Sequence, residues 1–236
     1  MKLMTSPGRI ARILLMVFVC LLLLHLGVGV WRHFLGHDDR FGIIHQFSFD
    51  RENNAPTYFS ALLLLVCAAL LAITAIAKGR AKDPFRRHWT ALSVVFAYMS
   101  ADEVGRYHEM WPTFMPLLER GKGIMHFPWI PVGIVVVALF SIAFLRFLLS
   151  LQRRWKILFF TAGVVYISGA LGLEAVCGLL KDVRCNQGLM YAVESTAEET
   201  LEMWGAILFI YSLLSYMHVN VGPLEIYFTR KLPDSG

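Results

Sequence analysis

Charge is scarce in this sequence. Only 17% of its 236 residues are Asp, Glu, Lys or Arg, whereas 57% are hydrophobic, and the mean hydropathy is +0.57. Soluble domains carry more charge, on about 25% of their residues. Several apolar runs also reach the ~20 residues that a helix needs to cross ~30 Å of hydrocarbon. The composition therefore excludes a soluble globular protein and predicts an integral membrane protein.

The apolar runs lack the polar–apolar alternation of membrane β-strands. They are continuous, so we expect an all-α polytopic helix bundle in the lipid bilayer. The formal net charge of +5 does not indicate a nucleic-acid partner, because Lys and Arg fall in short loops, where they set membrane orientation. Neither an internal repeat nor a second domain is visible, so residues 1–236 are expected to form one transmembrane domain.

Six apolar segments are predicted to span the membrane. Pro56 suits the start of the second, because its missing N–H would lack a partner there in any case. The fourth holds no acid and carries Arg146 near one end, so we expect it to face lipid. The predicted helices cover about 13–30, 57–77, 89–109, 129–149, 157–180 and 191–217. The Trp residues near helix ends are expected to be interfacial anchors, namely Trp31, Trp89, Trp111, Trp129 and Trp155.

The distribution of Lys and Arg predicts the orientation of the bundle. Six helices put both termini on one side of the membrane. Basic residues cluster before the first helix, in the loops 78–88 and 152–156, and in the tail, whereas the other three loops are acidic or mixed. Short loops rich in Lys and Arg remain in the cytoplasm. We therefore expect both termini to be cytoplasmic.

Carboxylates occur within the predicted spans, where a charge costs at least about 2.5–3.5 kcal/mol at the helix centre. Asp102 and Glu103 come near the end of the third helix, and four residues after Asp102 comes Arg106, the spacing of a helical ion pair. The cluster candidates on the third, fifth and sixth helices are Asp102, Glu103, His108, Glu109, Glu174, Glu198, Glu199 and Glu202. His25 lies alone on the first helix.

Helix rise places these polar residues in one layer. At ~1.5 Å per residue, Asp102, Glu174, Glu202 and His25 all lie about 20–26 Å from the basic ends of their helices. Glu198 and Glu202 also share one helical face. We therefore expect a single acidic site inside the bundle, toward the outer leaflet.

Two interpretations of this acidic site remain open. The acids could hydrogen-bond between helices with several of them protonated, or they could hold a cation, either protons or a divalent metal. Carboxylate and imidazole ligands suit zinc, manganese or iron, although the chain lacks an HExxH or ExxH motif. The metal-ligand candidates are Asp102, Glu103, His108, Glu174, Glu198 and Glu202, with His25, Glu109 and Glu199 as neighbours.

Three segments carry a family resemblance: SADEVGRYHE (100–109), ISGALGLEAV (167–176) and ESTAEETLEMWGAILFIY (194–211). Together they resemble a family of bacterial six-helix inner-membrane proteins with no assigned activity. The resemblance spans the second to sixth helices. It implies the same topology in a bacterial inner membrane and singles out the acidic residues and His108, and it brings no reaction with it. The membrane hydrolases related to alkaline ceramidases differ, because their paired-His motif in the last helix is absent here.

These patterns leave three functional hypotheses. The first is cation binding at the acidic site, which could serve metal-dependent chemistry on a membrane substrate through a metal-activated water. The second is a non-catalytic accessory subunit whose polar cluster pairs with a partner membrane protein. The third is a small proton-coupled transporter. Whether the chain is an enzyme stays open, as does a disulfide between Cys177 and Cys185.

Reporter fusions test the predicted orientation. A reporter fused after Gly236 should be active only if it functions in the cytoplasm, and one inserted at Asn186 only if it functions in the periplasm, because the basic loops stay inside. The reverse pattern would overturn both the orientation and the predicted depth of the acidic site.

Overall fold

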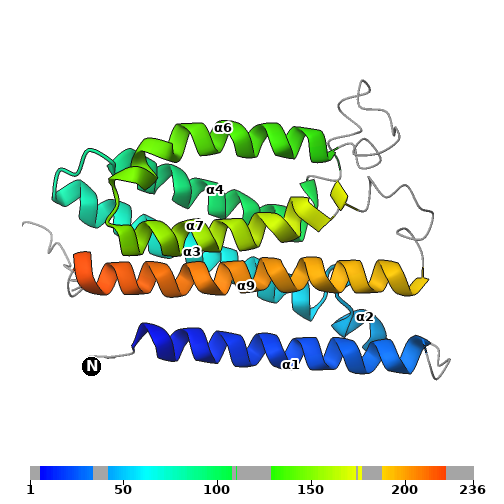
Figure 1. Ribbon diagram of the computed structural model, residues 1–236. Coiled ribbons are helices and arrows are strands. Elements are labelled where there is room, and N and C mark those ends of the chain that lie inside the picture. Colours follow the sequence, from blue (N-terminus) through cyan, green and yellow to red (C-terminus); the bar gives the residue numbers. More distant parts are fainter. Residues whose placement is uncertain are drawn as a thin grey trace, which may run out of the picture.

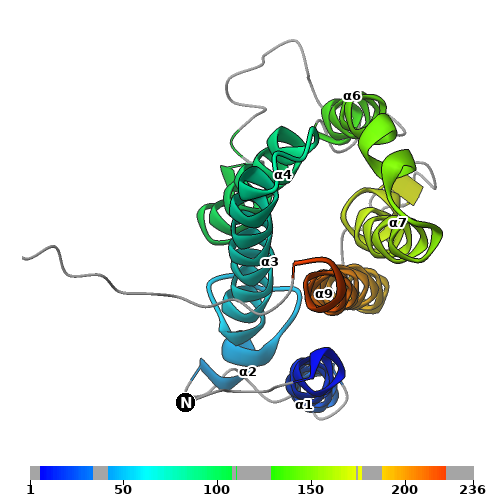
Figure 2. The same cartoon turned by 90° about the vertical axis from the view of Figure 1, so that its left-hand side faces the viewer.

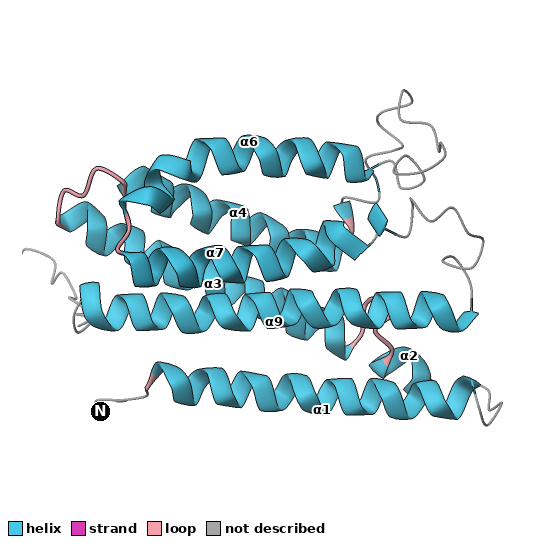
Figure 3. Ribbon diagram, viewed as in Figure 1, coloured by secondary structure: helices cyan, strands magenta, loops and turns pink. Residues whose placement is uncertain are grey.

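The computed structural model describes residues 6–33, 42–107, 110, 129–173, 175–176 and 188–221, the last range without the side chains of 188–191. Every regular element in these ranges is helical and none is a strand (Figure 3). The all-α prediction is therefore confirmed for the described residues. The elements are α1 (Pro7–His33), α2 (Ile43–Phe47), α3 (Ala55–Arg80), α4 (Arg86–Gly105), α6 (Trp129–Ser150), α7 (Arg153–Ile167), the π-helix η3 (Ser168–Leu173) and α9 (Gly188–Asn220).

The long helices run side by side, and α9 lies among them (Figures 1 and 2). It packs against α1, α3, α7 and η3, whereas α4 pairs mainly with α3, and α6 meets α7 and η3. The start of α1, the α3–α4 turn, the α6–α7 turn and the end of α9 all lie at the left end of the bundle in Figure 1. We call this the basic end, because the predicted cytoplasmic loops meet there.

Within the described residues, five helices are long and apolar enough to cross a membrane: α1, α3, α6, α7 with η3, and α9. Only 6% of the α6 span is buried, against 56% for α3 and 61% for α9, which agrees with the expectation that the fourth predicted helix faces lipid. The third predicted span corresponds to α4, which carries Arg86 and Arg87 at one end and Asp102 and Glu103 at the other. The sixth crossing and the orientation stay predictions.

Two predicted helices end differently in the structure. α4 stops at Gly105, and Arg106 follows in the left-handed conformation with φ 53°. The continuous helix predicted to residue 109 is therefore wrong, and Arg106 does not continue the helical face of Asp102. In the fifth predicted helix, regular α-helix ends at Ile167 and gives way to η3. The short helix α2 was not expected at all.

An aromatic core ties four helices together at the basic end. Trp89 of α4 packs against Phe147 of α6 with ring centroids 4.9 Å apart, and Trp155 of α7 meets Tyr216 of α9 at 5.5 Å. Trp89 and Trp155 are 1% and 2% exposed. Their predicted role as interfacial anchors is therefore wrong, because both indoles fill the space between helices.

Asn54 organises the segment that joins α2 to α3. Its side-chain amide donates to the backbone carbonyls of Ser48, Arg51 and His45 at 2.6, 2.7 and 3.0 Å. Its carbonyl oxygen caps α3, accepting the N–H and the hydroxyl of Thr57 at 3.1 and 3.0 Å. Asn54 is fully buried, so these bonds replace the water that the backbone groups would otherwise require.

The segment that Asn54 organises contacts three helices. Its Phe49 N–H donates to Nδ1 of His25 on α1 at 3.0 Å, and the Ser195 hydroxyl on α9 donates to the Phe49 carbonyl at 3.3 Å. Arg32 of α1 pairs with Asp50 at 3.2 Å. The segment thereby closes the end of the bundle that lies opposite the basic end.

Substitution of Asn54 tests this role. We expect Asn54→Ala to lower the free energy of unfolding by about 2–4 kcal/mol, because a helix cap is lost and buried carbonyls lose their donor. Asn54→Asp keeps the capping oxygen and should lose only part of that stability. Thermal unfolding in detergent, followed by circular dichroism, measures both. Equal stability of Asn54→Ala and wild type would contradict the assignment.

Candidate functional site

Carboxylates from three segments converge at the closed end of the bundle. Glu199 of α9 interacts electrostatically with Glu103 of α4, with Glu202 of α9 and with Glu52 in the α2–α3 segment. All four residues are only partly exposed. We call these four residues the carboxylate cluster. Glu103 and Glu202 were predicted to meet, and Glu199 was a predicted neighbour.

Tyr166 joins the carboxylate cluster from α7. Its hydroxyl lies within hydrogen-bonding reach of the Glu202 carboxylate, and it also interacts with Glu103 and Glu199. A phenol donates one hydrogen bond, so Tyr166 can stabilise charge on one of these acids. Tyr166 lies in the last turn of α7, two residues before η3 begins.

Two glycines let α7 and α9 approach closely enough for this contact. A Cβ at Gly169 would lie 2.8 Å from the backbone oxygen of Glu198, and one at Gly205 would lie 2.7 Å from the backbone nitrogen of Tyr166. Backbone atoms cannot move aside as a flexible side chain can. Small residues at such crossings are the usual means of close packing between membrane helices. The reach of Tyr166 to Glu202 therefore depends on both glycines.

The π-helix η3 lies directly beside the carboxylate cluster. A Cβ at Gly169, the second residue of η3, would also lie 3.0 Å from the Cγ atom of Glu202. Single π-turns interrupt the i→i−4 hydrogen-bond ladder and occur frequently at functional sites. The interruption of regular helix thus coincides with the acids in space.

Arg106 brings a permanent cation to the rim of the carboxylate cluster. Its left-handed backbone ends α4, and its Nε atom forms an ion pair with Glu52. The two side chains are 45% and 37% exposed. Water therefore screens this pair, and we expect it to contribute little to stability by itself.

His25 lies outside the carboxylate cluster and packs as a hydrogen-bonded core residue. Its Nε2 is 2.7 Å from the Thr196 hydroxyl, which donates its own proton to the Ala192 carbonyl, and its Nδ1 accepts the Phe49 N–H. These partners require the neutral imidazole with its proton on Nε2. The imidazole also stacks on the Phe49 ring, with the two ring centroids 4.5 Å apart. Both ring nitrogens are thus engaged within the protein.

The remaining predicted site residues divide into two groups. Asp102 is half-buried in the last turn of α4, and Glu198 places its backbone carbonyl against Gly169. Among the described residues, no three His, Cys, Asp or Glu side chains are arranged to hold a metal ion. His108, Glu109, Glu174, Cys177 and Cys185 lie outside the described residues.

Sequence analysis missed Glu52 and Tyr166. Glu52 stands in a polar connection with several other acids, and only the turn built by Asn54 distinguishes it. Tyr166 falls eight residues before Glu174 in an apolar helix, where a tyrosine is usually a packing residue. The available signal was its position just before two small residues, Ser168 and Gly169, because small residues mark a close helix crossing.

Together the fold and the site define an all-α protein with apolar helices of membrane-spanning length and an acidic cluster between three of its segments. A family model described as a domain of unknown function, DUF8692, matches residues 13–217. The chain belongs to this family. No curated protein and no solved structure matches the chain.

Glycine substitutions test the close approach of α7 and α9. We expect Gly169→Ala and Gly205→Ala each to lower the free energy of unfolding by about 1–3 kcal/mol, because the added methyl meets backbone atoms. Gly163→Ala on α7 is the matched control, since nothing lies within 4 Å of its added methyl. That change should be neutral or stabilise by about 0.5–1 kcal/mol. Thermal unfolding of the three variants decides, and three equal effects would contradict the close approach.

Proposed function

We propose that this protein is a six-span integral membrane protein that binds a cation at the carboxylate cluster. The observation that carries the proposal is the electrostatic interaction of Glu199 with Glu202 on the same helix and with Glu103 and Glu52 from two further segments. Two unit charges 4 Å apart interact by about 4 kcal/mol at an effective dielectric constant of ~20. Arg106 offers one positive charge at the exposed rim, so several ionised acids in this position require further positive charge.

Protons are the first candidate for this charge. Carboxylates that share a site seldom ionise together, and a shared proton then links them by hydrogen bonds. The Tyr166 hydroxyl beside Glu202 can replace part of that hydrogen bonding when a proton leaves. The cluster is therefore suited to take up and release protons.

A divalent metal is the second candidate, and it could serve metal-dependent chemistry on a membrane substrate. It would require acids and imidazole from the segments that hold Glu174 and His108, together with Glu103 and Glu202. A metal held there would activate a bound water. In either version, we place the cluster toward the periplasmic side of a bacterial inner membrane and both termini in the cytoplasm. The gathering of the basic loops at one end of the bundle supports this orientation (Figure 1).

Proton-coupled transport is the alternative that a specific observation favours. Transporters place their ion sites where membrane helices lose regularity. The prolines of the predicted spans lie at helix ends and supply no such break, but η3 is an irregular turn beside the carboxylate cluster. The accessory-subunit hypothesis needs a partner membrane protein that supplies positive charge to the same acids.

Glutamine variants of α9 separate the candidates. If a metal occupies the cluster, chelator should lower the melting temperature of the wild type, and Glu199→Gln and Glu202→Gln should lower it without chelator, because a ligand bound only to the folded state stabilises it. If protons occupy the cluster instead, chelator should have no effect on the melting temperature, and Glu199→Gln should leave it unchanged or raise it. Infrared spectra should then show a protonated carboxyl band that Glu199→Gln removes.

Glu194→Gln is the matched control for these variants. Glu194 lies on the same helix and is partly exposed like Glu199, but it shows no electrostatic interaction with the acids of the carboxylate cluster. It should change neither the chelator response nor the Glu199 band. A wild type that is indifferent to chelator and lacks a protonated Glu199 would end the proposal of a cation site.

A further inference from the structure

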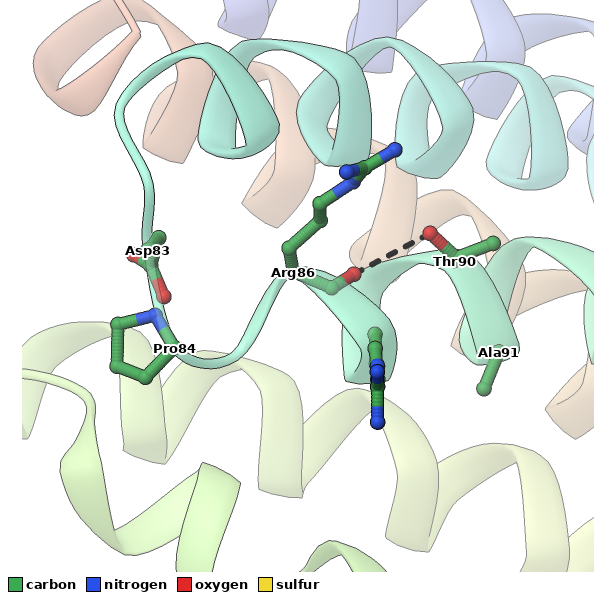
Figure 4. A pocket seen from close by; sticks show the side chains of 6 residues that line it. Asp83, Pro84, Arg86, Thr90 and Ala91 are labelled. Atoms are coloured by element: carbon green, nitrogen blue, oxygen red, sulfur yellow. Dashed lines mark hydrogen bonds between the residues drawn. The ribbon is translucent and has the colours of Figure 1, made fainter.

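Two adjoining cavities lie at the basic end of the bundle, far from the carboxylate cluster. The smaller has a volume of about 250 Å³ and is lined by residues of α3, α4, α6, α7 and α9. The larger, of about 680 Å³, lies over the α3–α4 turn and the first turns of α4 (Figure 4). Both are lined by Asp83 and Pro84, so they adjoin at this turn.

Trp155 lines the smaller cavity, and its indole carries a buried hydrogen-bond donor. Its indole is 2% exposed, and within the described part of the chain its Nε1–H has no hydrogen-bond partner. Gln152 and Asn220 add polar side chains to the same lining. A buried donor without an acceptor is unfavourable. An oxygen acceptor brought into the cavity by a ligand would therefore be stabilised there.

The charges around the two cavities are mostly positive. Lys78 lies 3.3 Å from the Asp83 carboxylate and 5.4 Å from the centroid of the Tyr216 ring. Asp83 also accepts the Phe85 N–H at 2.8 Å. The one acid of the lining is thus engaged with the turn and with Lys78.

Arg86 and Arg87 line the larger cavity, and no carboxylate in the described ranges pairs with either. Arg86 extends from the start of α4 toward α3 in Figure 4. Its side chain lies against Gly79, where a Cβ would come within 2.9 Å of Nε. The absence of a side chain at Gly79 lets the guanidinium lie across the turn and keeps positive charge at the cavity.

We propose that these cavities bind the phosphate headgroup of an anionic phospholipid. Arg86 and Arg87 would hold the phosphate, and the Trp155 N–H would donate to a phosphate or ester oxygen in the smaller cavity. The cavities lie where α3 ends at Arg80 and α4 begins at Arg86, which is the headgroup level of a bundle with apolar spans. Basic pockets between membrane helices are suited to anionic lipid headgroups. A free phosphate ion has the same charge, so the test must separate the two.

The full chain in lipid nanodiscs tests the proposal. Nanodiscs of phosphatidylcholine alone are compared with nanodiscs that also contain phosphatidylglycerol, and native mass spectrometry counts the retained phosphatidylglycerol. The anionic lipid should raise the melting temperature of the wild type and remain bound. Arg86→Gln and Arg87→Gln should each weaken the apparent affinity about fivefold. Trp155→Phe keeps the ring and removes the N–H, and should also weaken retention.

The double variant Arg9→Gln/Arg12→Gln is the matched control. It removes two exposed arginines at the same end of the bundle, on α1, away from the cavities. The control should retain as much phosphatidylglycerol as the wild type does. If it loses as much as the double variant Arg86→Gln/Arg87→Gln, the lipid is held by general surface attraction and the proposed site is wrong.

Two further outcomes would also overturn the proposal. One is a wild type that does not respond to phosphatidylglycerol. The other is stabilisation by inorganic phosphate in detergent that the arginine variants lose, which would identify a free phosphate ion as the ligand.

Discussion

Polar groups inside an apolar bundle must find their partners within the protein, and this constraint accounts for most of the architecture. An unsatisfied polar group in hydrocarbon costs several kcal/mol. His25 forms hydrogen bonds through both ring nitrogens, and the side chain of Asn54 provides partners for the backbone groups of a whole turn. Tyr166 does so for one carboxylate. These bonds join α1, α9 and the α2–α3 segment more specifically than apolar packing does.

α9 relates the two ends of the molecule. Its first half carries Glu199 and Glu202, and its last turns place Tyr216 among the indoles of Trp89 and Trp155. About 21 Å of helix separates Glu202 from Tyr216 at 1.5 Å per residue. Because α9 is continuous over this distance, the acidic cluster and the aromatic core are held at fixed positions on one rigid element.

The sequence predicted the long helices, because apolar length is a strong local signal. It also singled out the acids within the predicted spans, because charge is unusual there. It could not predict how α4 ends, since Arg106 leaves the helix to pair with Glu52, a residue fifty-four positions away. Nor could it predict η3, which depends on packing between Gly169 and α9. Trp89 and Trp155 have the residue type and the position near a helix end that are typical of interface anchors. Only the arrangement of the neighbouring helices buries them.

The close crossing of α7 and α9 links helix packing to the charge of the carboxylate cluster. Gly169 and Gly205 set the distance at which Tyr166 meets Glu202. Any cation that binds the clustered acids favours the packing in which those acids are close together. If a cation binds there as proposed, its binding and the loosening of the crossing oppose each other by one coupling free energy. The π-turn lies at this crossing, where the chain departs from regular helix, so a change in cation occupancy would act first on η3 and its contact with α9.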